Sequence, residues 1–365
     1  MFAYMKSVKD ELVRYLETFF AALGPDYAGL NTWDWSLPAA AASQGSPGRD
    51  ALKRLFDYTA GGKMLRGALV SFTHDMYAGS CRGAAVAAGA AMELFQSAFL
   101  IHDDIMDRDN LRRGKPAMHA QYSGLAHSAA IQDPAHMGEA LGICAGDLAI
   151  FLAFDILSSL EAGAETKTRL AARFCRELQY VGLAQMADVW QGARAGGAEI
   201  EDILALYRCK TGRYTFSLPF AAGLILAGQE EKLVEHFVLL GEKMGILFQI
   251  KDDELGLWAD EKELGKPVGS DIAENKKTLY REILFARAEE DTRKKLAAIF
   301  GKQPSPGEIS IVLEKMDALG VRGEVAHKAG LLHKEASALI DALPPAGIWT
   351  DRLRQLLDYN LNRGK

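Results

Sequence analysis

The chain has 365 residues and a formal net charge of −6, with 49% hydrophobic and 25% charged residues. This composition supports a large core and is ordinary for a soluble protein, and the acidic balance argues against a nonspecific nucleic-acid binder. The four cysteines show no C-x-x-C spacing, which argues against a zinc site and is typical of a reducing compartment, so we expect a cytoplasmic protein.

The predicted elements are helices along most of the chain. Charged residues interrupt the apolar residues of segment 1–23, so we expect no secretory signal there. Residues 84–107 predict one long helix, which opens with alanines and a glycine that let a neighbouring helix approach closely. Segment 140–157 is apolar but contains Asp147 and Asp155. Because carboxylates are rare inside membranes, we expect a buried helix there and no stable membrane insertion.

Breaks rich in glycine, proline and small polar residues separate these helices. We expect them at residues 29–48, 124–138, 264–277 and 301–307. No segment shows sustained period-two alternation bounded by hairpin turns, which excludes a sheet as the main architecture. We therefore predict an all-α fold with a single domain over residues 1–365. Residues 50–285 carry the motifs described below, and residues 1–49 and 300–365 are expected to be peripheral.

Two aspartate clusters lie inside apolar, helix-patterned segments. Asp103 and Asp107 are four residues apart and therefore share one helical face, whereas Asp104 points about a quarter-turn away. The second cluster begins with Asp252 and Asp253. Carboxylates in apolar surroundings are costly unless a cation or hydrogen bonds compensate them. The clusters indicate two acidic walls around a phosphorylated ligand. Magnesium fits best, because it takes one or two carboxylates together with phosphate oxygens and water.

Basic residues near these clusters are candidate phosphate ligands. Arg112 and Arg113 follow the first cluster, and adjacent arginines can each form paired hydrogen bonds with phosphate oxygens. Residues 61–66 place two basic side chains about one helical turn apart after a glycine turn, with a spacing that differs from a Walker A loop. Lys210 and Thr211 interrupt an apolar helical segment, where a kink would expose a carbonyl and a hydroxyl to a developing positive charge. Taken alone, the Arg112-Arg113 and Lys210-Thr211 pairs are better explained as exposed surface charge, and the signal at residues 61–66 is weak.

The combination of motifs resembles the trans-prenyltransferases, the polyprenyl diphosphate synthases. In chain order the motifs are Gly-Gly-Lys-x-Leu-Arg, Asp-Asp-x-x-Asp with Leu-Arg-Arg-Gly, Lys-Thr, Phe-Gln-x-x-Asp-Asp and Gly-Lys-Pro-x-Gly-Ser-Asp-Ile. They extend from about Gly61 to Leu279, and Ala145-Gly146-Asp147 and Gln185-x-x-Asp188 match further family positions. The resemblance implies a helical bundle of the isoprenoid synthase type with a central substrate cavity, and it implies a homodimer.

The resemblance also implies a role for each motif residue. The magnesium ligands would be Asp103, Asp107 and Asp252, with three ions per active site when ligands are bound. Isopentenyl diphosphate would be bound by Lys63, Arg66, Gln96 and Arg113. The allylic diphosphate would be bound by Arg112, Lys210, Lys266 and Lys276. The allylic cation would be stabilised by Thr211 and Gln249.

The implied reaction, a step of isoprenoid biosynthesis, is ionisation, condensation and elimination. Metal and Lys/Arg charge make diphosphate a competent leaving group, the alkene of isopentenyl diphosphate attacks the allylic cation, and the departing diphosphate removes a proton. No protein nucleophile is needed. Ala98 and Phe99 would wall the pocket for the growing tail, and Phe95 lies about one turn before them. Because Ala98 leaves room where short-chain members often have an aromatic residue, we expect a twenty-carbon all-trans product, with fifteen carbons next.

Two positions depart from the family pattern. Gly256 stands where many members have a third aspartate in the second cluster, and Gly67 replaces the usual proline. We expect slightly weaker metal binding from the first change and tolerance of the second.

Two alternatives to an elongating synthase stay open. A class I terpene cyclase would share the fold and the first acidic cluster, but residues 252–260 lack its Asn/Asp-Asp-x-x-Ser/Thr-x-x-x-Glu signature. A noncatalytic subunit that modulates another synthase would typically lose its acidic motifs, and both are present here.

Overall fold

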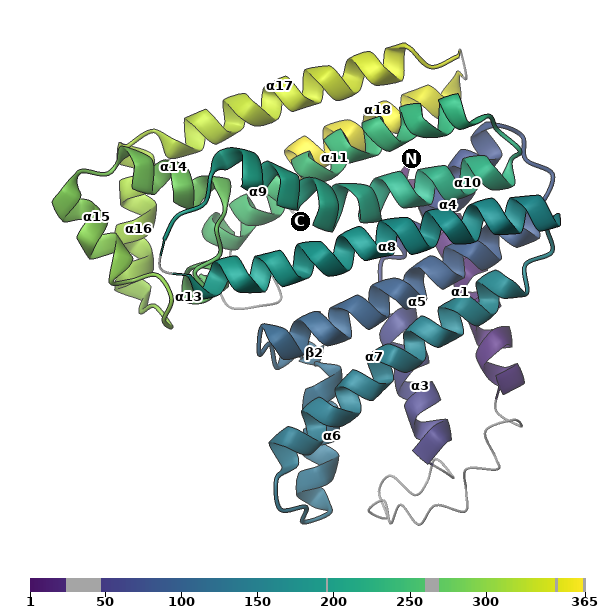
Figure 1. Ribbon diagram of the computed structural model, residues 1–365, viewed down its shortest axis with the longest axis horizontal. Helices are drawn as coiled ribbons and strands as arrows, with labels where there is room; N and C mark the ends of the chain where they lie inside the picture. Colours follow the sequence, from purple (N-terminus) through teal and green to yellow (C-terminus); the bar gives the residue numbers. More distant parts are fainter. Residues whose placement is uncertain (24–46, 195, 260–268, 345–346, 364–365) are drawn as a thin grey trace. The chain divides into compact units, whose positions relative to one another are not determined.

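The computed structural model of the protein describes residues 1–23, 47–194, 196–259, 269–344 and 347–363 (Figure 1). These residues are almost entirely helical, which confirms the predicted all-α class. Within them, the one sheet is a two-residue antiparallel ladder between β1 (Leu111–Arg112) and β2 (Lys115–Pro116). The predicted break at 29–48 lies outside the described residues, apart from its last two positions.

The chain divides into two compact units, which are described separately below. The first unit comprises residues 2–171 and 222–228. The second unit comprises Met1 and residues 172–221 and 229–365. The prediction of a single domain over the whole chain stays a prediction.

The first unit is built around one long central helix. Its elements are α1 (Phe2–Leu23), α3 (Pro47–Ala60), α4 (Leu65–Met76), α5 (Arg82–Met106), α6 (Met118–Ser128) and α7 (Pro134–Ser158). α5 is the helix predicted at 84–107, and it packs against α1, α4 and α7. Residues 84–95 of α5 are all buried, because the alanines and the glycine leave space for neighbours on every side.

The departure from the family pattern at Gly67 has a packing reason. A Cβ atom at Gly67 would lie 2.7 Å from the carbonyl oxygen of Gly89, so α4 and α5 cross at these two glycines. The Gly67 N–H also donates a hydrogen bond to the buried Glu93 carboxylate at 2.7 Å. A proline at position 67 would bring ring atoms into this contact and would remove the donor.

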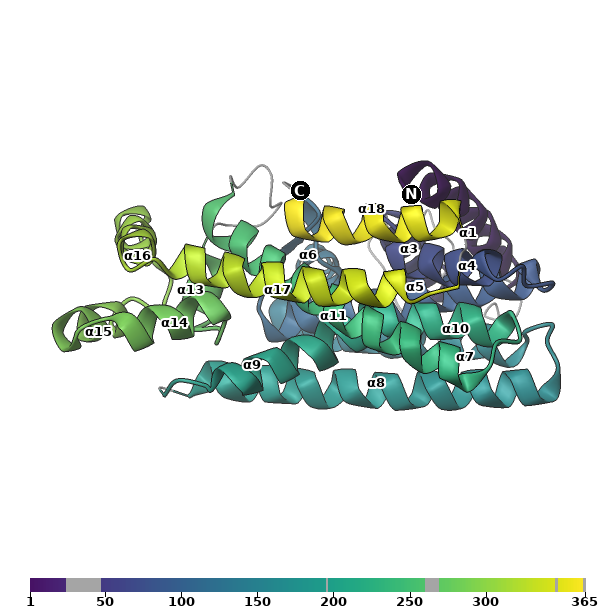
Figure 2. The ribbon, with the colours of Figure 1, turned by 90° about the horizontal axis from the view of Figure 1, so that it is seen from above.

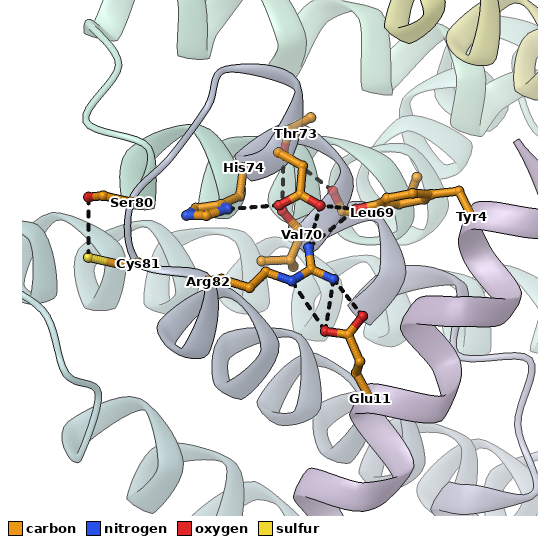
Figure 3. Close-up of polar contacts among 10 residues, drawn as sticks. Tyr4, Glu11, Leu69, Val70, Thr73, His74, Ser80, Cys81 and Arg82 are labelled. Carbon is orange, nitrogen blue, oxygen red and sulfur yellow. Dashed lines mark hydrogen bonds and ion pairs between the residues drawn. The ribbon is translucent and has the colours of Figure 1, made fainter.

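A charged network joins α1 to α4 and to the start of α5 (Figure 3). The Arg82 guanidinium donates to both carboxylate oxygens of Glu11 at 3.0 Å and also to Asp75. The Tyr4 hydroxyl donates to Asp75 at 2.8 Å, and His74 Nδ1 lies 3.1 Å from the same carboxylate. Burial alone would raise the pKa of Asp75, but these hydrogen bonds and the Arg82 charge bring it below its ordinary value.

Two helices, α5 and α7, are long and apolar enough to cross a membrane, a criterion that the core helix of a soluble protein also meets. The most apolar window of α5 is 83% buried, whereas that of α7 is 44% buried. One face of α7 packs closely against α5, since a Cβ atom at Gly146 would lie 2.2 Å from His102 Nε2. Its other face exposes Ile143 and Phe151. The helix expected to be buried at 140–157 is therefore buried on one face only.

The second unit contains a helical layer that reaches the C-terminus. The elements are α8 (Ala164–Ala193), α9 (Ile200–Tyr207), the π-helix η2 (Arg208–Ser217), α10 (Leu218–Leu226), α11 (Glu231–Trp258), α13 (Ser270–Ala273), α14 (Leu279–Arg287), α15 (Glu290–Ala297), α16 (Pro306–Ala318), α17 (Val321–Asp341) and α18 (Ile348–Asn362). α8 begins, and α10 ends, in the first unit. α17 and α18 lie along α11 (Figure 2), so the last described helix returns to the second acidic cluster.

The helix boundaries follow local capping signals. The break predicted at 124–138 is shorter in the structure, because α6 continues to Ser128 and Asp133 caps α7 by accepting from the His136 N–H at 3.1 Å. The break predicted at 301–307 is confirmed, and α16 starts after Ser305 in a capping box with Glu308. Of the break predicted at 264–277, the described part contains the short helix α13.

Candidate active site

The first acidic wall is the last turn of α5, in the first unit. Asp103 lies in this turn and Asp107 caps the helix, with the Asp107 N–H donating to the Asp103 carbonyl oxygen at 2.8 Å. Both residues are partly exposed, and they share one face as the spacing predicted. Two carboxylates are thus presented together at the end of a largely buried helix.

Asp104, between them, has a different environment. Its carboxylate is fully buried and accepts from Arg112 Nε at 2.6 Å and from the Tyr58 hydroxyl at 3.1 Å. Burial raises the pKa of Asp104 to about 6, although the hydrogen bonds and charge of Arg112 oppose this shift. Asp104 therefore holds Arg112, a predicted diphosphate ligand, in place. The sequence did not predict this role for Tyr58, because a tyrosine on an amphipathic helix is ordinary.

The β1–β2 hairpin places Arg113. Its two-residue loop consists of Arg113 (φ 55°) and Gly114 (φ 72°), and positive φ at both positions is typical of the tightest hairpin turns. Arg113 Nη1 donates to the carbonyl oxygen of Tyr58 at 3.2 Å. The guanidinium also lies against Gly62, where an added Cβ atom would be 3.2 Å away. The glycine turn and Arg113, which the sequence indicated separately, meet in the structure.

Arg66 lies in the first turn of α4, and Lys63 directly precedes the left-handed residue Met64 (φ 53°) at which this helix begins. Behind them, the buried Glu93 of α5 accepts from the Gly67 N–H. Burial raises the pKa of Glu93, while that hydrogen bond and the charges of Arg66 and Arg113 oppose the shift. Gln96 follows Glu93 by about one turn of α5 and is partly exposed. The four predicted ligands of isopentenyl diphosphate thus all belong to the first unit.

A cavity of about 630 Å³ in the first unit has a mainly charged lining. It includes Arg112 and Arg113 together with Lys53, Arg54 and Lys115. Lys53 is paired with Asp57 at 2.5 Å and Arg54 with Asp50 at 2.7 Å. The lining suits an anionic ligand, and sequence reasoning had missed Lys53 and Arg54 because α3 carries no motif.

In the second unit, the kink predicted at Lys210 and Thr211 is the π-helix η2. This helix packs on α11 through two glycines, since a Cβ atom at Gly245 would lie only 2.1 Å from the Cα atom of Gly212. Lys210 Nζ donates to Asp188 of α8 at 2.5 Å, which joins two positions of the family pattern. π-Helical turns are frequent at functional sites.

The second acidic wall is the C-terminal part of α11. The Asp252 side chain is 44% exposed and forms an ion pair with Arg363, at the end of the described chain. Arg363 also donates to the carbonyl oxygen of Phe248 at 3.0 Å, and its guanidinium carbon lies 3.6 Å from the Phe248 ring centre. An arginine beyond the last helix carries no sequence signal for such a contact. Asp252, the predicted metal ligand, is thus already paired with a cation.

Asp253 is buried and accepts two hydrogen bonds. The donors are the Tyr207 hydroxyl and Gln249 Nε2, the latter at 2.8 Å. Gln249 Oε1 in turn accepts from the Thr211 hydroxyl at 2.7 Å, so the two predicted cation-stabilising residues are brought together. Burial and repulsion from Asp271 raise the pKa of Asp253, while the hydrogen bonds from Tyr207 and Gln249 stabilise its ionised form and oppose this shift.

Lys276 forms an ion pair with Glu274 at 2.8 Å and lies 3.9 Å from Asp271. A Cβ atom at Gly256 would lie 3.2 Å from the Asp271 carboxylate, so the aspartate that many family members have there would face another carboxylate. Glycine at position 256 avoids this repulsion between like charges. Lys266 lies outside the described residues.

The donor set of the first wall fits magnesium. Among the residues that the structure describes, no group of three or more His, Cys, Asp or Glu side chains is arranged to hold a metal by itself. Asp103 and Asp107 supply two hard oxygen ligands on one face, and magnesium bound to phosphate takes one or two protein carboxylates. Asp252 belongs to the other unit, so the prediction that the two walls face each other stays a prediction.

Comparisons with known proteins identify the family of the chain. A family model described as polyprenyl synthetase matches residues 49–316. A geranylgeranyl diphosphate synthase of Sulfolobus acidocaldarius is 36% identical over 316 residues, which are 84% of this chain and 89% of that protein. A short chain isoprenyl diphosphate synthase of Methanothermobacter thermautotrophicus is 32% identical over 314 residues, 84% of this chain and 87% of that protein.

A crystal structure of a geranylgeranyl pyrophosphate synthase from Corynebacterium glutamicum, complexed with isoprenyl diphosphate and magnesium, is also similar. The two structures superpose with a TM-score of 0.88 at 27% sequence identity. The match covers 99% of this chain and 98% of the Corynebacterium glutamicum chain. The family match covers most of the chain, and it includes both acidic clusters and every basic motif. The chain therefore belongs to the polyprenyl synthetase family, the trans-polyprenyl diphosphate synthases.

Proposed function

We propose that this chain condenses isopentenyl diphosphate with an allylic diphosphate and releases an all-trans prenyl diphosphate of twenty carbons, with fifteen carbons the next candidate. The proposal is supported mainly by two partly exposed carboxylates, those of Asp103 and Asp107. They belong to the same unit as Arg112 and Arg113, the arginines predicted to bind phosphate. The proteins named above are prenyl diphosphate synthases, which favours elongation over a terpene cyclase or a noncatalytic subunit.

In this proposal the motif residues bind and activate the diphosphates. Asp103 and Asp107 would hold magnesium, which would neutralise the charge of the departing diphosphate. We expect three magnesium ions per active site, and Asp252 would hold another of them. Arg112, oriented by Asp104 and Tyr58, would bind the allylic diphosphate. The other allylic ligands would be Lys210, Lys266 and Lys276. The ligands of isopentenyl diphosphate would be Lys63, Arg66, Gln96 and Arg113.

The direct test is an assay of purified protein with magnesium, isopentenyl diphosphate and each allylic primer in turn. We expect elongation to a twenty-carbon diphosphate, measured by chromatography of the products, and no turnover when a chelator removes the metal. A cyclised hydrocarbon as product would favour the cyclase. Failure to elongate any primer would contradict the proposal.

Lys63→Ala and Arg66→Ala should each raise the KM for isopentenyl diphosphate about ten- to hundredfold. Each change removes a hydrogen bond from a charged donor to phosphate, which contributes about 1.5–3 kcal/mol. Steady-state kinetics with each substrate varied would show this, with Lys294→Ala in the exposed part of α15 as a control for lost charge. A rise in the KM of the allylic substrate instead would mean that the two diphosphate sites are exchanged.

Ala98→Phe should stop elongation at least one five-carbon unit earlier. Ala98 is fully buried in α5, and a packed site cannot take up an aromatic ring without strain. Phe95→Ala should lengthen the product, and Phe95→Ala with Phe154→Ala should lengthen it further. The Phe154 ring of α7 packs edge-to-face on Phe95 with centroids 5.1 Å apart and would otherwise close the gap. Chromatography of the products measures the chain length made by each variant. An unchanged product length in all three variants would place the pocket wall on another helix.

We also propose a homodimer in the cytoplasm. α8 exposes Leu183, Met186 and Trp190, which are 64%, 71% and 70% exposed and recur at helical spacing. Large exposed apolar stripes of this kind mark protein interfaces.

The four free cysteines fit a reducing compartment. Sedimentation should give twice the chain mass of 39.8 kDa, and Met186→Asp should lower it; a monomeric wild-type protein would contradict the dimer.

A further inference from the structure

We propose that Tyr207 is a positioning residue of the condensation: through Asp253 it holds the Gln249 amide, and with it the Thr211 hydroxyl, in a single orientation. The inference rests on the proposed function and on the role that the family resemblance implies for Gln249 and Thr211, which is to stabilise the allylic cation. Tyr207 is the last residue of α9 and belongs to none of the motifs that identify the family. Its hydroxyl nevertheless reaches the second aspartate of the second acidic cluster.

The direction of the Tyr207 hydrogen bond is imposed by the backbone. The N–H of Leu279, the first residue of α14, donates to the Tyr207 oxygen at 3.3 Å. A backbone N–H can only donate, so the tyrosine oxygen accepts there and its own proton is directed to Asp253. Tyr207 and Asp253 are both 5% exposed, so water does not compete for either group.

Asp253 then decides which way the Gln249 amide faces. The two ends of a glutamine amide have nearly the same shape but opposite polarity. Asp253 accepts at both of its oxygens, at one from the Tyr207 hydroxyl and at the other from Gln249 Nε2 at 2.8 Å, so Gln249 turns its Oε1 to Thr211. The Thr211 hydroxyl donates to that Oε1 at 2.7 Å. The lone pairs of the threonine oxygen, and no proton, are therefore left to face a positive charge.

The opposite amide orientation would be unfavourable for the reaction. Its Nε2 hydrogens would point toward Thr211 and would place the positive end of the amide dipole beside the developing cation. Preorganised dipoles of the correct sign are the means by which a site stabilises charge in a transition state. Tyr207 keeps Asp253 turned toward Gln249 by holding the other carboxylate oxygen, and it joins the end of α9 to α11 and to the start of α14 at this point.

The test is Tyr207→Phe, which keeps the ring and removes only the hydroxyl. We expect kcat to fall about tenfold while the KM values of both diphosphates stay within about twofold, since the loss concerns a hydrogen bond to a charged group that acts in the transition state. Asp253→Asn, which offers one acceptor oxygen instead of two, should behave in the same way and serves if the tyrosine variant does not fold. Tyr280→Phe is the matched control, because this buried tyrosine of the same unit packs on Trp258.

A double-mutant cycle separates positioning from a general structural effect. In a Gln249→Ala background, Tyr207→Phe should lower kcat no further, because the residue through which it acts is absent. A tenfold loss that persists in that background, a loss confined to KM, or an unchanged kcat overturns the inference. Failure of the wild-type protein to elongate any primer overturns the proposed function instead, so the two outcomes are distinguishable.

Discussion

Asp103→Ala and Asp107→Ala should each lower kcat/KM on the order of a thousandfold or more while the protein stays folded. Each substitution removes one of the two carboxylates that would hold magnesium, and diphosphate without its counter-charge is a poor leaving group. Both side chains are partly exposed at the end of α5, so their loss opens no cavity in the core. Activity assays and helical circular dichroism, measured on the same preparations, would show the two effects separately.

Asp104→Ala is the matched control in the same helical turn. Asp104 is fully buried and paired with Arg112, so its removal leaves a largely buried guanidinium without its partner. Removing one member of a buried pair costs about 3–5 kcal/mol, and we expect a clear fall in thermal stability for this variant alone. Activity retained by Asp103→Ala or Asp107→Ala at saturating magnesium would contradict the metal assignment.

Gly245→Ala should destabilise the second unit by about 3 kcal/mol and should also lower activity. The new Cβ atom would lie 2.1 Å from the Cα atom of Gly212, and a backbone atom cannot rotate away as a side chain can. The π-helix η2 would have to separate from α11, which displaces Lys210 and Thr211 together. The two effects therefore have one cause.

The stability loss can be measured by denaturant or thermal unfolding. Gly330→Ala in α17 is the control, because an added Cβ atom meets nothing within 4 Å there. Alanine is a better helix former than glycine, so this control should gain about 0.5–1 kcal/mol. A Gly245→Ala protein with the wild-type melting temperature would show that the two helices do not touch in solution.

The sequence by itself determined the all-α class, the helix at 84–107 and the shared face of Asp103 and Asp107. These features depend on residues a few positions apart, and the helical repeat converts such spacings directly into geometry. For the same reason, the sequence predicted the break at 301–307 and the irregular helix at Lys210 and Thr211.

Only the tertiary structure decided the partners of the buried carboxylates. Asp104 and Tyr58 are 46 positions apart, as are Asp253 and Tyr207, and Asp252 and Arg363 are separated by 111. The helical period contains no information about contacts over such distances, because they depend on how whole helices pack. The burial that makes Asp104 a support for Arg112, while Asp103 and Asp107 stay partly exposed, likewise arises only when α3 and the β1–β2 hairpin meet the end of α5.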